Sequence, residues 1–201
     1  MTEPDYYFAT NKAYDLLNKY QDYSYPTPIF SIIRDFDDIK LLSYSEAAKI
    51  FNTTFEEFYS IASSQYGFSI KNFSAHQTLI LYNDKKDETV IRFTLAHELG
   101  HYILFHTKDS ENEDKEANCF ARNILCPIPV IYELGLTHIH EYVNTFYVSE
   151  PMAQVSIDKK LCDYGNITKD NYSMLNDRIM CFYNGITINE LYGYNDQQYY
   201  A

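Results

Sequence analysis

Two histidines and a glutamate with fixed spacing are the residues of this chain best suited to catalysis. His97, Glu98 and His101 form an H-E-x-x-H motif. On a helix, residues four apart lie one turn apart on the same face, so both imidazoles can reach one metal ion, typically zinc. Glu98 is rotated by about 100° from His97, so it is badly placed as a third ligand but can face a metal-bound water. The spacing therefore predicts a site for metal-assisted hydrolysis.

The third metal ligand must come from outside this motif. The metzincin pattern needs a glycine and a further histidine, but Leu104 and Thr107 occupy those positions, so that class is excluded. His106 follows the motif closely, yet at about 100° per residue it would point away from His97. We expect His106 to be a helix-end cation that the helix dipole favours.

The acidic start of the next helix offers better candidates for the third ligand. The apolar stripe of that helix places Asp114 and Glu113 on its inward side and Glu116 at the margin. A carboxylate turned inward needs a partner, and a metal ion is one. We therefore rank Asp114 first as the third ligand, with Glu113 and Glu116 as alternates.

Hydrophobic periodicity predicts several helices and a few short strands around these residues. Strand 77–83 directly precedes the H-E-x-x-H helix, so we expect it to hold a peptide by edge pairing through Leu79, Leu81 and Asn83. Helices are expected at 5–20, 28–36, 89–106, 114–126, 138–146 and 150–162, with two short ones in 45–65, and strands at 39–44, 66–71, 77–83 and 179–183.

Composition limits the classes of function that fit this chain. The 201 residues include 16 lysines and arginines against 28 aspartates and glutamates, giving a formal charge of −12. A field of that sign disfavours direct nucleic-acid binding and attracts a basic partner. No segment is long and apolar enough to span a membrane, and the first residues lack a signal-peptide pattern, so we expect a cytoplasmic protein.

Two segments resemble the ImmA/IrrE metallopeptidases. Residues 92–106 are similar to the active helix of that family, and residues 114–127 are similar to its E-x-x-A-N-x-F-A-x-x-L-L-x-P segment. The resemblance implies that His97 and His101 are zinc ligands and that Glu98 is the catalytic glutamate. It places Asp114 at the third ligand, which is usually glutamate in the family, so one methylene is missing there.

The resemblance also implies a fold and a function. The implied fold is an α+β, zincin-like domain over residues 1–165, best matched at 28–162, in which a short three-stranded sheet packs on a helical bundle. Residues 166–201 would be a C-terminal extension of unknown role. The implied activity is zinc-dependent cleavage of a helix-turn-helix repressor of a prophage or mobile element. A metal-bearing regulator that binds a repressor without cutting it is the alternative, and a structural protein with a chance motif is a third interpretation.

Overall fold

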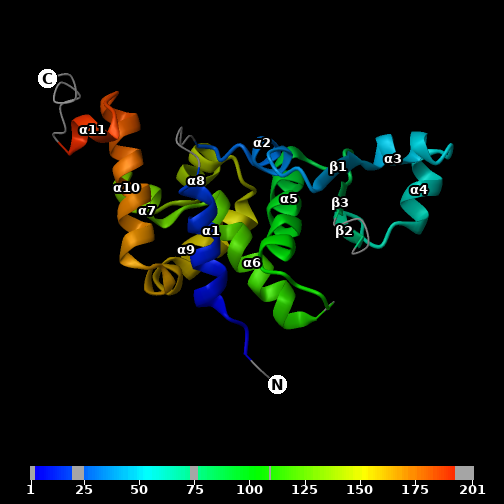
Figure 1. The fold of residues 1–201 in the computed structure, drawn as a ribbon, viewed down its shortest axis with the longest axis horizontal. Coiled ribbons are helices and arrows are strands. Elements are labelled where there is room, and N and C mark those ends of the chain that lie inside the picture. Colours follow the sequence, from blue (N-terminus) through cyan, green and yellow to red (C-terminus); the bar gives the residue numbers. More distant parts are fainter. Residues whose placement is uncertain (1–2, 20–24, 73–76, 109, 193–201) are drawn as a thin grey trace, which may run out of the picture.

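The computed structural model describes residues 3–19, 25–72, 77–108 and 110–192 (Figure 1). Within those ranges the chain forms three strands, β1 (Ile39–Ser43), β2 (Gly67–Asn72) and β3 (Gln77–Tyr82). The helices there are α1 (Tyr6–Leu17), α2 (Ile29–Arg34), α3 (Tyr44–Ile50), α4 (Phe55–Ile61), α5 (Glu88–Ile103), α6 (Glu111–Leu125), α7 (Ile128–Glu133), α8 (Ile139–Phe146), α9 (Glu150–Asn166), α10 (Lys169–Asn184) and α11 (Ile188–Leu191). This architecture confirms the predicted α+β class, with a small sheet beside a helical bundle.

The sheet has the order β1-β3-β2, so β3 is its central strand. β1 runs parallel to β3 and β2 runs antiparallel to it. Successive side chains of a strand point to opposite faces of the sheet. Accordingly, Ile80 is buried in the main core with the helical bundle, whereas Leu81 packs with Tyr44 and Phe58 from the α3–α4 pair. The sheet thus separates a large core from a small one.

Helices α5 and α6 pack directly against each other, and this contact positions the candidate site. A Cβ built on Gly100 of α5 would lie 3.2 Å from the Ala117 Cα of α6. The absence of a side chain at Gly100 therefore allows the two helix backbones to approach closely. Helix α6 begins at Glu111 because Ser110 caps it, its hydroxyl accepting from the Glu113 backbone amide.

Two elements of the C-terminal half differ from the sequence-based expectations. The prediction of a strand at 179–183 is wrong, because those residues lie in α10. Leu175 and Ile179 are buried on one face of this helix at helical spacing. Helix α7 is not among the helices expected above, and the segment that forms it contains the prolines Pro127 and Pro129. Both prolines lie at its N-terminus, where the missing amide hydrogens cost no helical bond.

Other expectations fall outside what the structure tests. The domain boundary at residue 165 stays a prediction, although Leu175 and Ile179 beyond it belong to the main core. Residues 193–201 of the expected extension lie outside the described residues. None of the helices in the described part of the chain combines the length and apolarity that a membrane span requires.

Candidate metal centre

The two histidines of the motif lie side by side on α5, as the helical spacing predicts. Their Nε2 atoms are 3.0 Å apart, and both side chains are mostly buried. Burial lowers the pKa of His97, and it lowers the pKa of His101 to about 3, helped by the neighbouring His97 and His106. Both imidazoles are therefore neutral at pH 7, which is the form that binds metal ions.

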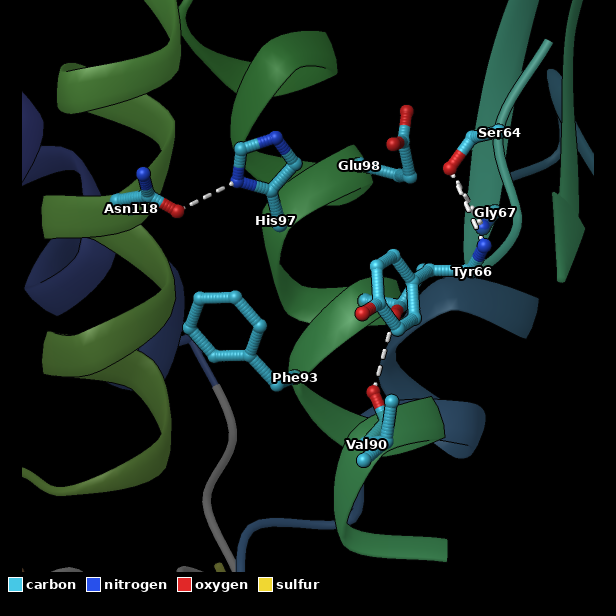
Figure 2. A pocket seen from close by; sticks show the side chains of 9 residues that line it. Ser64, Tyr66, Gly67, Val90, Phe93, His97, Glu98 and Asn118 are labelled. Carbon is cyan, nitrogen blue, oxygen red and sulfur yellow. Dashed lines mark hydrogen bonds between the residues drawn. The ribbon is translucent and has the colours of Figure 1, made fainter. Parts of the chain in front are cut away.

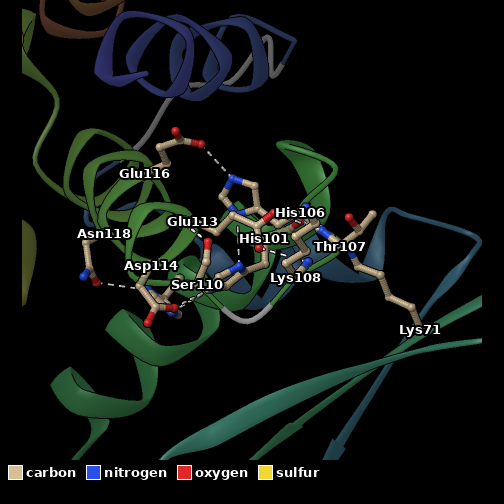
Figure 3. A network of polar contacts seen from close by, with 11 residues as sticks. Lys71, His101, His106, Thr107, Lys108, Ser110, Glu113, Asp114, Glu116 and Asn118 are labelled. Carbon is tan, nitrogen blue, oxygen red and sulfur yellow. Dashed lines mark hydrogen bonds and ion pairs between the residues drawn. The ribbon is translucent and has the colours of Figure 1, made fainter. Parts of the chain in front are cut away.

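Asp114 brings a carboxylate to this histidine pair from the first turn of α6 (Figure 3). Its Oδ1 lies 3.4 Å from His101 Nε2 and 4.0 Å from His97 Nε2. The three donor atoms lie within 4.8 Å of one another. The Asp114 side chain faces the pair but stays 51% exposed, so it is less buried than its inward helical position suggested.

The two alternate ligands are engaged elsewhere. Glu113 accepts hydrogen bonds from the backbone amides of Thr107 and Lys108, at 3.3 and 3.0 Å. Glu116 lies 2.9 Å from His106 Nε2, and its other oxygen accepts from the Asp5 backbone amide at 2.7 Å. Of the three acidic candidates, the structure brings only Asp114 to the two Nε2 atoms.

The donor set fits a zinc ion. His97 Nδ1 lies 3.0 Å from the Asn118 side-chain oxygen, so a neutral His97 carries its proton on Nδ1 and leaves the Nε2 lone pair unprotonated. Two nitrogen ligands at about 2.0–2.1 Å from a tetrahedral zinc would be about 3.3 Å apart, close to the 3.0 Å found here. Two imidazole nitrogens and a carboxylate oxygen match zinc's usual ligands, and a catalytic site keeps the fourth position open.

Glu98 lies beside this group on the side that faces the sheet. Glu98 is 8% exposed, and burial raises the pKa of its carboxyl. Contacts with Ser69 of β2 and the charge of Lys71 act in the opposite direction on that pKa. A carboxylate with a raised pKa is suited to taking and returning a proton near neutral pH.

A cavity of about 310 Å³ opens next to His97 and Glu98 (Figure 2). Successive turns of α5 form one wall, Asn118 of α6 lies on one side, and the segment before β2 closes the other. Part of the lining is apolar or aromatic. The lining residues are Ser64, Tyr66, Gly67, Val90, Phe93, Thr94, His97, Glu98 and Asn118.

One family model matches this chain. It describes the IrrE N-terminal-like domain, a peptidase family, and it covers residues 51–156, which is more than half of the chain. The chain belongs to this family. This membership confirms the resemblance inferred from residues 92–106 and 114–127, and it supports a metallopeptidase. No curated protein matches the chain.

The prediction that strand 77–83, which is β3, holds a substrate peptide by edge pairing is wrong for this IrrE-like domain. β3 hydrogen-bonds to β1 on one side and to β2 on the other, so its backbone has no free edge. Leu81 and Asn83 are buried, and Leu79 packs against the small core. Sequence periodicity located the strand but could not order it within the sheet. The edge strand next to α5 is β2, whose Lys71 side chain donates to the His101 carbonyl oxygen at 3.2 Å.

His106 also differs from its expected place in the IrrE-like domain. We expected α5 to continue to residue 106, but it ends at Ile103, and Phe105 adopts a left-handed conformation with φ 57°. This turn folds His106 back, where it is buried with its Nδ1 3.0 Å from His101 Nδ1. No sequence signal announces the turn, because phenylalanine rarely adopts a positive φ.

Proposed function

We propose that this chain is a zinc-dependent endopeptidase that cleaves a protein substrate. The observation that carries the proposal is the convergence of His97 Nε2, His101 Nε2 and Asp114 Oδ1 within 4.8 Å, beside a buried Glu98. A zinc ion held by these residues would lower the pKa of a water to about 7 and polarise a substrate carbonyl. Family membership supports the metallopeptidase class independently of this geometry.

Glu98 has the role of general base and then general acid in this proposal. Its carboxylate takes a proton from the attacking water and passes it to the nitrogen of the leaving amine. Its raised pKa suits both halves of that transfer, since the group must hold a proton transiently. The cavity next to Glu98 would receive a substrate side chain beside the cleaved bond. Tyr66, Val90 and Phe93 in its lining favour an apolar one.

The backbone of the substrate would pair with β2. This strand is at an edge of the sheet, and its Ser69 contacts Glu98. An extended peptide added to a free sheet edge gains main-chain hydrogen bonds without any sequence requirement. The substrate would then run past Glu98 and present a peptide bond to the group of His97, His101 and Asp114.

We infer that the substrate is a helix-turn-helix repressor of a prophage or mobile element, and that cleavage takes place in the cytoplasm. The resemblance to ImmA/IrrE peptidases supports this choice. The formal charge of −12 supports it as well, because a DNA-binding repressor is basic and opposite charges favour association. The charge argument concerns the protein partner and not DNA, which an acidic surface repels.

A second function is favoured by one observation. Asp114 is shorter than the family's usual glutamate, and its carboxylate stays 51% exposed at 3.4 and 4.0 Å from the two Nε2 atoms. A weakly held metal would suit a regulator that binds a repressor without cutting it. The two functions differ in whether the repressor survives contact with the protein.

Co-expression with a candidate helix-turn-helix repressor tests the choice, with mass spectrometry of the products. The wild-type protein should yield two repressor fragments. Glu98→Gln should bind zinc as the wild type does and leave the repressor intact, whereas His101→Ala should lose zinc and cleavage together. An intact repressor that co-purifies with zinc-loaded wild type would support the regulator instead. Normal cleavage by Glu98→Gln would contradict the mechanism. A wild-type protein that purifies without zinc would favour the third interpretation, a structural protein with a chance motif.

A further inference from the structure

A buried histidine lies directly behind one of the proposed ligands. His106 follows the left-handed turn at Phe105, and its side chain is 6% exposed. The Lys71 ammonium donates to the carbonyl oxygens of both His101 and His106, which fixes the turn against β2. Figure 3 shows His106 between His101 and Glu116.

Three side chains form a continuous row of hydrogen bonds. His101 Nδ1 lies 3.0 Å from His106 Nδ1, and His106 Nε2 lies 2.9 Å from Glu116 Oε2. The second oxygen of Glu116 accepts from the backbone amide of Asp5 at 2.7 Å, and Asp5 also caps α1. The row therefore connects the metal site to the N-terminal segment of the chain.

The row fixes which nitrogen of each ring carries the proton. A carboxylate only accepts hydrogen bonds, so His106 carries its proton on Nε2. When His101 Nε2 holds a metal ion, the proton of the His101 ring is on Nδ1, and His106 Nδ1 accepts it across the 3.0 Å contact. His101 Nε2 is the atom that faces His97 and Asp114, so the row contacts the opposite nitrogen of the ring and leaves Nε2 for the metal ion.

We propose that Glu116 and His106 are positioning residues that hold His101 in its metal-binding tautomer. This inference rests on the proposed metal site, and it gives a function to two residues that neither bind the metal nor touch the substrate. A partner behind a metal-binding imidazole fixes the orientation of the ring, and loss of such a partner typically lowers metal affinity about 10–100-fold.

A matched pair of variants on α6 tests the proposal. Glu116→Ala removes the carboxylate that His106 contacts. Glu113→Ala removes the same charge from the same helix but only frees the backbone amides of Thr107 and Lys108. Competition with a chromophoric chelator should show zinc affinity about 10–100-fold weaker for Glu116→Ala. Glu113→Ala should stay close to the wild type. Equal affinities for the two variants would overturn the proposal.

A double variant separates positioning from a general loss of structure. If Glu116 acts through His106, then His106→Phe combined with Glu116→Ala should bind zinc about as weakly as His106→Phe alone. If the fold-loss of zinc affinity in the double variant equals the product of the losses in the two single variants, Glu116 acts by another route. The thermal midpoint of the zinc-free variants serves as the control for folding.

The tautomer can also be read without any variant. Long-range proton–nitrogen NMR spectra of the zinc-free wild type should show His106 protonated on Nε2, the nitrogen that donates to Glu116. The opposite tautomer would overturn the inference even if zinc binds. Wild type that binds no zinc but shows the expected tautomer would contradict the proposed function and leave the hydrogen-bond row intact.

Discussion

Glu98 and Asp114 are both carboxylates close to the same histidine pair, and their surroundings assign them different roles. Glu98 is buried, and burial raises its pKa, which suits proton transfer. Asp114 is half-exposed and lies within reach of both Nε2 atoms, which suits a ligand. The sequence could predict both positions, because helical spacing alone determines which side chains share a face. It could not predict the place of His106, which depends on a left-handed turn at Phe105 that carries no local signal.

A charge placed in the cavity should change the substrate preference. Val90 lines the cavity, so Val90→Asp puts a carboxylate where we expect an apolar substrate side chain. We expect cleavage beside leucine, isoleucine, methionine or phenylalanine to fall by roughly tenfold or more, since even one methylene in such a pocket is worth about 1–3 kcal/mol. Mass spectrometry of a digested peptide mixture measures this preference.

The matched control is Val155→Asp, the same substitution at an exposed position of α9. It should leave the preference unchanged. A Val90→Asp enzyme with wild-type preference would show that the substrate side chain does not enter this cavity.

At the scale of elements, the distance between α5 and α6 determines whether Asp114 reaches the histidines. The helices approach closely at Gly100, where a Cβ would lie 3.1 Å from the Phe120 ring and 3.3 Å from the Ala117 carbonyl oxygen. Both helices were predicted from their apolar periodicity. The order of the strands was not predictable, because it depends on pairing between distant segments rather than on local pattern.

Gly100→Ala should separate the two helices slightly. The new methyl group meets backbone atoms of α6 that cannot rotate away, so we expect a net loss of about 1–2 kcal/mol in the free energy of unfolding. Zinc affinity should fall as well, because Asp114 moves with α6. Gly165→Ala in α9 is the control: nothing lies within 4 Å of its Cβ, so it should gain about 0.5–1 kcal/mol from helix propensity. Urea unfolding measures both variants, and a Gly100→Ala protein as stable as wild type would contradict this account.

At the scale of the whole molecule, one apolar core extends from the site to α10. Leu175 and Ile179 of α10 are fully buried in the same core as Leu95 and Leu99 of α5. Asn171 of α10 donates to Asp15 of α1 at 3.1 Å. The sequence suggested a strand at 179–183 because those apolar residues are contiguous. Helix α10 packs instead on the distant helices α1 and α7, and Phe182 and Tyr183 lie against the ring of Tyr25. Local pattern does not reveal these partners.

Removing a buried side chain from α10 should therefore destabilise the entire fold. Leu175→Ala should lower the free energy of unfolding by about 2–5 kcal/mol in a single transition. Met174→Ala, at the adjacent and 48% exposed position, should change it by less than about 0.5 kcal/mol. Circular dichroism during thermal or urea unfolding measures both. A Leu175→Ala protein whose main transition is unchanged would show that α10 is an appendage.

The central claim is that His97, His101 and Asp114 hold one divalent cation beside Glu98. Anomalous diffraction at the zinc absorption edge, from crystals of the zinc-loaded protein, tests it most directly. We predict a single peak about 2.0–2.1 Å from both Nε2 atoms and about 2.0–2.2 Å from an Asp114 carboxylate oxygen. A peak coordinated by Glu113 or Glu116 in place of Asp114, or the lack of a peak between the two histidines, would contradict the account.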